Sequence, residues 1–157
     1  MLITLEKAGL NDAAELYRLQ IKSFCALLRR YQDYSSSPGA EKPERTIQRL
    51  MDPSTDYYFI SLQEDRQATH IGALRICNLG ELCKLKQIFI LPDYQGNGYA
   101  QMAIAAAEAL YPFCKRWELD TILQKAKLCY LYEKLGYRKT GKVEHVKDGM
   151  DIVFYAK

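Results

Sequence analysis

A six-residue segment with two glycines, Gln95-Gly96-Asn97-Gly98-Tyr99-Ala100, constrains the fold more than any other part of the chain. Residues 84–91 before it are a strand-forming run that Pro92 ends, and the residues after it, up to Pro112, are rich in Ala and poor in charge. These patterns predict a strand, a tight turn and a helix buried against a sheet. Main-chain N–H groups at the start of such a helix favour a phosphate group. A Gly-rich turn that binds nothing is the alternative.

The chain before this segment changes from helical to strand periodicity near Asp56. Asp12, with Glu15 three residues later, predicts an N-cap followed by apolar residues at helical spacing. The expected elements are a strand at 2–5, a long helix from Asp12 to Leu28, a loop at 31–43, a short helix at 44–51, a β-hairpin made of 57–62 and 71–76, and a third antiparallel strand at 84–91.

The chain after the buried helix predicts a βαβ unit and a closing hairpin. A strand at 117–123 follows a helix of this length and is therefore expected to be parallel to the strand before that helix. Leu128, Leu131 and Leu135 mark a short helix, and Gly136 is the residue expected to end it in the left-handed conformation. Residues 137–146 and 151–155 then form a hairpin around Asp148-Gly149.

The length of 157 residues predicts one compact domain over residues 1–157, and the composition is that of an ordinary globular protein. Basic and acidic residues number 22 and 19, and this net charge of +3 is too weak and diffuse to indicate nucleic-acid binding. The five cysteines contain no C-x-x-C pair, so neither a disulfide framework nor a zinc site is expected, and the thiols indicate a cytoplasmic protein. No apolar run approaches the roughly 18 residues of a membrane span, and no signal-peptide pattern is present.

Two motifs make the chain resemble a known family. The segment from Gln95 to Ala100 matches Q/R-x-x-G-x-G/A at every specified position, and Leu131-Tyr132-Glu133-Lys134-Leu135-Gly136-Tyr137 matches L-Y-E-K-x-G-F/Y further along the chain. On these residues the chain resembles the GNAT superfamily of acyl-CoA-dependent N-acyltransferases. The resemblance implies an α+β or α/β fold with a mixed, mostly antiparallel central sheet of about seven strands, helices on both faces, and a splayed parallel pair formed by the fourth and fifth strands.

The resemblance also implies that acetyl-CoA is the co-substrate and that no metal takes part. The residues it assigns to acetyl-CoA lie on the fourth strand and in the turn after it, and they are Ile88, Phe89, Ile90, Gln95, Gly96, Asn97, Gly98, Tyr99 and Ala100. Many members carry an Asn seven residues before the Tyr of the second motif, where it helps to hold the pantetheine arm. Lys125 occupies that position here.

Tyr132 and Asp120 are the catalytic candidates. Tyr132 resembles the family's general acid, and a phenol with an ordinary pKa of about 10 is protonated at neutral pH and can donate to a leaving thiolate. Asp120 occupies the place where some peptide-amine acetyltransferases of the family carry a Glu that acts as a base. The alternatives are that Tyr132 is a core residue of an amphipathic helix and that Asp120 is a structural carboxylate that accepts main-chain N–H groups.

The acceptor is less constrained. Family members bind it between the first helical region and the closing hairpin, which would place Tyr31, Asp33, Tyr34 and Glu81 near it. Neither His70 nor His145 has a partner at a recognisable spacing, and we interpret both as surface residues.

The function these observations favour is an N-acetyltransferase that moves the acetyl group of acetyl-CoA to a primary amine of a small molecule or peptide. The amine would attack directly in a ternary complex. The alternative is a non-catalytic CoA-binding regulatory module. Neither a nucleic acid nor a membrane is an expected partner, and the sequence leaves open whether the chain forms a homodimer.

Overall fold

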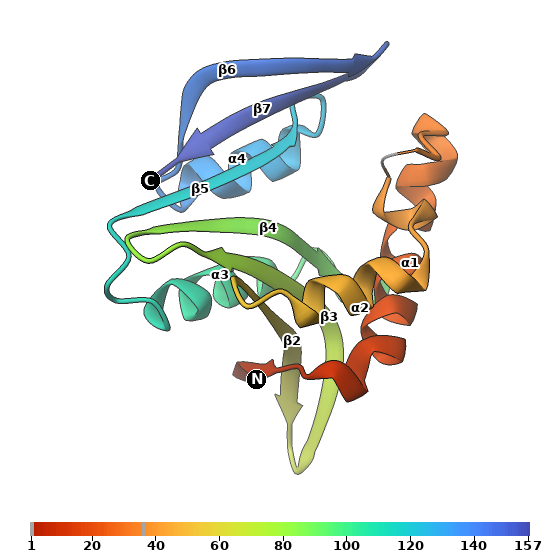
Figure 1. The fold of residues 1–157 in the computed structure, drawn as a ribbon, viewed down its shortest axis with the longest axis vertical. Coiled ribbons are helices and arrows are strands. Elements are labelled where there is room, and N and C mark those ends of the chain that lie inside the picture. The colour runs from red at the N-terminus through yellow and green to blue at the C-terminus, as the bar shows by residue number, and fades with distance from the viewer. Residues whose placement is uncertain (1, 36) are drawn as a thin grey trace.

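The computed structural model describes residues 2–35 and 37–157 as a central sheet with helices on both sides (Figure 1). The strands are β1 (Leu2–Lys7), β2 (Thr55–Glu64), β3 (Gln67–Asn78), β4 (Leu82–Ile90), β5 (Arg116–Ile122), β6 (Arg138–Lys147) and β7 (Met150–Ala156). The α-helices are α1 (Ala13–Tyr31), α2 (Pro43–Met51), α3 (Tyr99–Ala109) and α4 (Ala126–Lys134), and short 3₁₀ turns cover Leu10–Asp12, Pro38–Ala40 and Pro92–Tyr94.

The sheet order is β1-β2-β3-β4-β5-β7-β6, and every pair is antiparallel except β4 with β5. The predicted mixed sheet of seven strands is therefore confirmed, and so is the parallel βαβ unit. Gly136 ends α4 with a φ of 97°, as predicted, and the Tyr137 N–H then donates to the Tyr132 carbonyl at 3.0 Å. This turn stacks the ring of Tyr137 edge-on against that of Tyr132.

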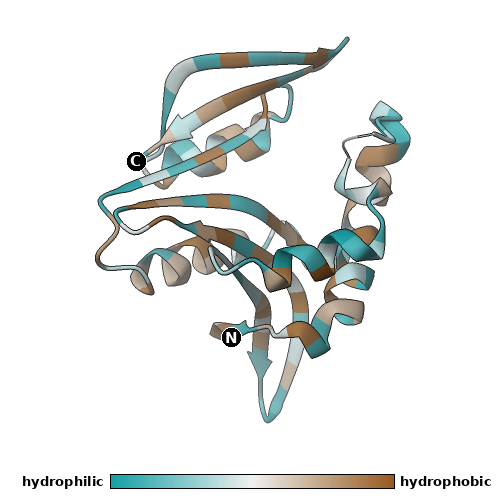
Figure 2. Ribbon diagram, in the orientation of Figure 1, coloured by the Kyte–Doolittle hydropathy of each residue, from teal (hydrophilic) through white to brown (hydrophobic). Residues whose placement is uncertain are grey.

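Two apolar clusters lie on opposite faces of the sheet, because strand residues alternate between the faces. Figure 2 shows this alternation as bands of hydrophobic and hydrophilic colour along the central strands. The larger cluster joins the sheet to α3 and α4 through residues such as Ile104 and Tyr132. The smaller cluster joins it to α1 and contains Leu16, Phe59 and Phe89. The four helices thus cover two different faces of one sheet.

A β-bulge in β4 determines where the sheet opens. On β3, Arg75 pairs with Gln87 while the next residue, Ile76, pairs with Leu85, so that Lys86 is an extra residue without a partner. Such a bulge bends its strand. The parallel pairing of β4 with β5 ends at Lys84 and Glu118, two residues before the bulge. The two strands therefore separate beyond this point, and Figure 1 shows them diverging toward the end of α1.

Asp12 is the N-cap residue of α1, as predicted, but its side chain makes no capping hydrogen bond to that helix. Its carboxylate accepts a hydrogen bond from the Gly9 N–H at 2.8 Å and so closes the 3₁₀ turn before the helix. Glu15 instead reaches Nδ1 of His70 at 2.8 Å, and Glu6 reaches its Nε2 at 2.8 Å. His70 therefore has two carboxylate partners that are distant in sequence. His145 also has a partner, since its Nδ1 lies 2.8 Å from Asp151.

Candidate active site

The turn between β4 and α3 has the geometry of an anion site. Gly96 and Gly98 have φ values of 80° and 79°, which glycine adopts without strain. A Cβ placed on either would point into open space, so the main chain there is accessible to a ligand. Among the described residues, no protein acceptor faces the N–H groups of Gly96, Asn97, Gly98 and Ala100. These donors lie at the positive end of α3 and fit a pyrophosphate.

The side chains of the turn brace it. Gln95 Nε2 donates to the Ile90 carbonyl at 2.8 Å, which ties the turn to the end of β4. Asn97 Nδ2 donates to the carbonyls of Tyr94 and Gln95 at 3.2 and 3.3 Å. Both amides thus stabilise the loop and leave its main-chain donors free for a ligand. Tyr99 is buried in the larger apolar cluster, where it anchors the first turn of α3.

A cavity of about 470 Å³ lies beside the gap between β4 and β5. It is large enough for a small-molecule acceptor. Residues from α1, α2, α4, β3, β4, β5, β6 and β7 and from the loops between them line it. They include Phe24, Tyr31, Glu41, Arg49, Arg75, Gln87, Ile88, Asp120, Lys125, Tyr132 and Ile152. The cavity therefore brings the two catalytic candidates to one place together with parts of α1, α2 and the closing hairpin.

Tyr132 is 5% exposed and lines this cavity from α4. In the described part of the chain its hydroxyl makes no hydrogen bond, although its ring packs against Tyr137 and Tyr155. Burial, and secondarily the negative charge of Asp120, raise the pKa of Tyr132 above its usual value of 10. The phenol consequently keeps its proton across the neutral range and has that proton available for a leaving group.

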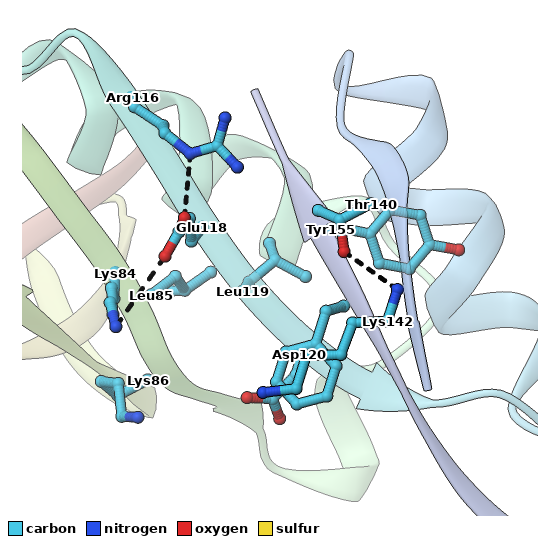
Figure 3. A pocket seen from close by; sticks show the side chains of 11 residues that line it. Lys84, Leu85, Lys86, Arg116, Glu118, Leu119, Asp120, Thr140, Lys142 and Tyr155 are labelled. Carbon is cyan, nitrogen blue, oxygen red and sulfur yellow. Dashed lines mark hydrogen bonds and ion pairs between the residues drawn. The ribbon is translucent and has the colours of Figure 1, made fainter. Parts of the chain in front are cut away.

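Asp120 lies on β5 where a second cavity, of about 320 Å³, meets the first, and it lines both (Figure 3). Its side chain is exposed to these cavities. The walls of the cavities exclude much of the water that would surround a carboxylate on an open surface. This burial raises the pKa of Asp120, and Glu144 raises it further, while the positive charges of Lys86 and Lys142 oppose the shift. A carboxylate with a raised pKa is a stronger proton acceptor than an ordinary one.

The four predicted acceptor residues separate into two pairs. Tyr31 and Asp33 line the cavity. Tyr34 does not, since it is 68% exposed, and Glu81 does not, since it lies at the far end of β4 in an ion pair with Lys115 at 3.1 Å. Glu81 precedes the paired part of β4 and β5, whereas the cavity lies beyond it.

Lys125, in place of the family's Asn, closes the cavity on its α4 side. Its Nζ lies 5.8 Å from the centroid of the Tyr31 ring, and the Tyr31 carbonyl accepts a hydrogen bond from Lys147 of the closing hairpin. Burial, with a smaller contribution from Arg30, lowers the pKa of Lys125. Tyr31 thus links the end of α1 to two elements on the other side of the gap.

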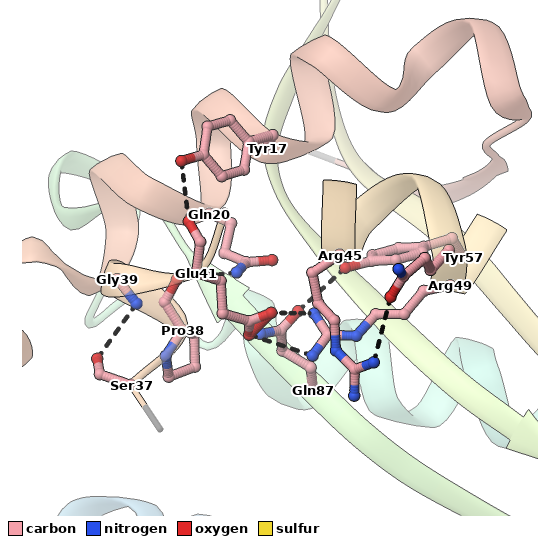
Figure 4. Close-up of polar contacts among 11 residues, drawn as sticks. Tyr17, Gln20, Ser37, Pro38, Gly39, Glu41, Arg45, Arg49, Tyr57 and Gln87 are labelled. Atoms are coloured by element: carbon pink, nitrogen blue, oxygen red, sulfur yellow. Dashed lines mark hydrogen bonds and ion pairs between the residues drawn. The ribbon is translucent and has the colours of Figure 1, made fainter. Parts of the chain in front are cut away.

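A group of polar residues in the cavity wall was missed by the sequence analysis. Arg49 of α2 contacts Glu41 twice, with Nη1 at 2.7 Å from Oε2 and Nη2 at 3.2 Å from Oε1. Tyr57 donates to Gln87 at 3.2 Å beside them (Figure 4). Glu41 and Arg49 are eight positions apart, Tyr57 and Gln87 are 30 positions apart, and none of these residues belongs to a motif. The signal in the sequence was an Arg at position 75 inside an apolar strand pattern.

Comparison with solved structures places the fold among acetyltransferases. An acetyltransferase from Thermus thermophilus matches with a TM-score of 0.73 at 18% identity, over 100% of this chain and 97% of that one. A spermidine N-acetyltransferase from Vibrio cholerae, in complex with CoA and spermine, matches with a TM-score of 0.75 at 20% identity, over 99% and 94%. No curated protein matches the chain significantly by sequence.

The sequence profile of the Acetyltransferase (GNAT) family matches residues 15–137, which span both predicted motifs. The mixed sheet of seven strands with a parallel β4/β5 pair agrees with the fold of these neighbours. The chain belongs to the GNAT family of acetyltransferases, and it is an N-acetyltransferase that takes the acetyl group from acetyl-CoA.

Proposed function

We propose that this chain, as one acetyltransferase domain, acetylates a primary amine that binds in the cavity between α1, α2 and the β4/β5 gap. The observation that carries the proposal is that one cavity joins the gap to both Tyr132 and Asp120. The unpaired N–H groups after Gln95 support pyrophosphate binding at the outer end of the gap. Between these points, the main-chain groups of Ile88 to Ile90 that are engaged neither by β3 nor by Gln95 are available to the pantetheine arm, because β5 does not pair with them.

Asp120 accepts the proton of the amine, directly or through a water molecule, as the amine nitrogen bonds to the thioester carbonyl. Tyr132 donates its phenolic proton to the sulfur as the C–S bond breaks, and the products are an acetamide and CoA. The pKa of each group is raised by burial, which favours proton acceptance by Asp120 and retention of the proton on Tyr132 until the thiolate leaves. Both groups act on one tetrahedral intermediate, so no acetyl-enzyme is formed.

Two further parts of the proposal concern location and metal. The described chain contains five cysteines without disulfides, which supports a reducing compartment such as the cytoplasm. No helix in the described residues is long and apolar enough to cross a membrane.

Within residues 2–35 and 37–157, no three His, Cys, Asp or Glu side chains are arranged to hold a metal ion. We propose that the reaction uses the two side chains alone.

Thiol release from acetyl-CoA, measured over a panel of amines, tests the proposal. We expect amine-dependent release and a rise in melting temperature on addition of acetyl-CoA. Stabilisation by acetyl-CoA without thiol release for any amine would support the non-catalytic alternative. An unchanged melting temperature at saturating acetyl-CoA would contradict both.

A further inference from the structure

One row of residues on the α1/α2 face of the sheet breaks the apolar pattern of its neighbours. Tyr57, Arg75 and Gln87 are direct cross-strand partners on β2, β3 and β4, so their side chains share this face. The adjacent row on the same strands is Phe59, Ala73 and Phe89, and all three are buried in the smaller apolar cluster. Arg75 places a cation next to this apolar row. Burial of a cation costs free energy unless a partner compensates its charge.

The structure contains only part of the compensation that Arg75 needs. The groups that act on the Arg75 guanidinium are Arg49, which repels it, and Tyr57 and Glu41, which favour its charged form. Glu41 is already engaged by both guanidinium nitrogens of Arg49, and the two side chains are 17% and 14% exposed. Among the described residues Arg75 makes no ion pair, and its Nε is buried without a hydrogen-bond acceptor. Burial and the charge of Arg49 lower the pKa of Arg75. Two guanidinium groups thus lie near one carboxylate, which pairs with Arg49 alone.

The charged residues that line the whole cavity show the same excess of positive charge. Its lining residues include the cations Arg49, Arg75, Lys86 and Lys125 and the anions Asp33, Glu41 and Asp120, which leaves one positive charge in excess. A polycationic acceptor would add positive charge to a wall that already has it. An acceptor with its own anionic group would neutralise the excess and supply the acceptor oxygen that Arg75 Nε lacks.

We propose that Arg75, with Arg49 beside it, binds a carboxylate carried by the acceptor amine, so that the substrate is a free amino acid or a similar small amino carboxylate. This inference rests on the proposed function. A guanidinium binds a carboxylate through two parallel hydrogen bonds, which fixes the orientation of the bound molecule as well as its position. Arg75 and Tyr132 line one cavity of about 470 Å³, which is large enough for such an acceptor. The carboxylate contact therefore orients the amine toward Asp120.

Paired ligands that differ only in the carboxylate test this inference without relying on turnover. The unmodified chain is saturated with CoA, and the rise in melting temperature is measured for several amino acids, for their carboxamides, and for the corresponding amines that lack the carboxyl group. Spermidine and O-phosphoethanolamine represent polycationic and phosphorylated amines. We expect the amino acids to bind about 10- to 100-fold more tightly than their carboxamides, the range that corresponds to charged hydrogen bonds. With acetyl-CoA, kcat/KM is expected to show the same order.

Arg75→Gln should abolish the difference between each amino acid and its carboxamide, while Arg75→Lys should retain part of it because the charge remains. Arg45→Gln is the matched control, since Arg45 lies on α2 near Arg49, contacts Gln48 at 3.4 Å, and does not line the cavity. If Arg75→Gln does not fold, Arg75→Lys and Arg49→Gln supply the same comparison.

Equal binding of amino acids and carboxamides, or tighter binding of spermidine or of the phosphorylated amine, would overturn the inference and leave the proposed function intact. A lower melting temperature of Arg75→Gln with an unchanged preference for carboxylates would show that Arg75 is structural and would also overturn it. Absence of any effect of acetyl-CoA on the unmodified chain would instead contradict the proposed function.

Discussion

The two faces of the sheet are built on different principles. The face under α3 and α4 carries the larger apolar cluster, and the small side chains of Ala103 and Ala107 let α3 pack closely on it. The face under α1 and α2 carries a smaller apolar cluster, next to which Arg75 and Gln87 place polar side chains in the row that begins with Tyr57. The first face presents main-chain donors at the start of a rigidly packed helix. The second presents side chains gathered from distant segments.

This difference separates what is general in the molecule from what is particular to it. Main-chain groups at a helix N-terminus recognise a phosphate whatever the acceptor is, so the α3 side can serve any acetyl-CoA enzyme. In the proposal above, charged side chains on the α1/α2 side select one class of acceptor. Substitutions on the two sides should therefore have different signatures, with effects on acetyl-CoA from one side and on acceptor and pH dependence from the other.

The largest effect is expected from Gly98→Val. A β-branched residue at a φ of 79° is strained, and its side chain would occupy the open space in front of the N–H donors. We expect a loss of acetyl-CoA affinity of about 100-fold or more, which corresponds to about 3 kcal/mol, measured by calorimetry. Gly80→Val is the control, because Gly80 has a φ of 85° and open space as well but lies in the β3–β4 turn. Equal losses in both variants would contradict a specific role for the turn.

Tyr132→Phe should lower kcat by about 100-fold, since general-acid catalysis typically contributes at least that much. The KM for acetyl-CoA and the melting temperature should change little, because the hydroxyl makes no hydrogen bond with described residues and the ring remains. Tyr130→Phe is the matched control on the same helix, at a side chain that is 68% exposed. Unaltered turnover in Tyr132→Phe, with chemistry shown to limit the rate, would return Tyr132 to a packing role.

Asp120→Asn should lower the rate about tenfold at pH 7, because only a small fraction of an amine with a pKa of about 8 to 10 is unprotonated there. The raised pKa of Asp120 places the acidic limb of the wild-type pH profile above the range of an ordinary carboxyl group, and the variant should lack that limb. Above pH 9 the deficit should shrink. A deficit that stays constant above pH 9 would indicate that Asp120 positions the acceptor.

Asp120→Asn should also affect the melting temperature. The direction of that change distinguishes a base from a structural carboxylate. A raised pKa in the folded state means that the folded chain holds this proton more tightly than the unfolded chain. Its contribution to stability is present below the unfolded pKa and is lost as the pH rises through the folded pKa. At pH 7 Asp120→Asn should therefore melt at the same temperature or higher, whereas a variant that melts earlier would favour the structural alternative.

The smallest effect is expected at His70, away from both ligand sites. Burial lowers the pKa of His70, but the hydrogen bonds and charges of Glu6 and Glu15 outweigh it and raise the pKa above 6.5. The resulting stability is present below pH 6.5 and is lost as the pH rises through the folded pKa. We expect about 0.5 kcal/mol less stability at pH 8 than at pH 6, because both carboxylates are more than one-third exposed. Urea unfolding of His70→Gln should show equal free energies of unfolding at pH 6 and pH 8. A difference that persists in this variant would arise from other titrating groups.

The α3 side of the molecule could be predicted from the sequence and the α1/α2 side could not. Gln95 to Ala100 is a contiguous motif whose function depends on main-chain geometry, and the second motif gave the position of Tyr132 in the same way. The order of all seven strands and four helices followed from periodicity, Pro and Gly. Local patterns determine such features, so one sequence is enough to find them.

Several contacts on the α1/α2 face join residues that are 30 or more positions apart. Tyr57 meets Gln87 across three strands, and His70 meets Glu6 and Glu15 across the sheet. Neither contact follows from spacing, because it arises from strand register and helix placement. Glu81 was expected near the acceptor, yet it lies at the opposite end of β4 because the strand runs away from it toward the cavity.

The extra residue at Lys86 changes which faces the two halves of β4 present. Cys83 and Leu85 belong to the cluster under α3 and α4, whereas Phe89 belongs to the cluster under α1, although all three have odd numbers. The alternation of β4 side chains between the two faces of the sheet therefore shifts by one residue. The shift lies where β4 separates from β5. Loss of one residue there would exchange the faces of everything from Gln87 onward. The gap between β4 and β5 therefore lies beside a register shift of a single residue.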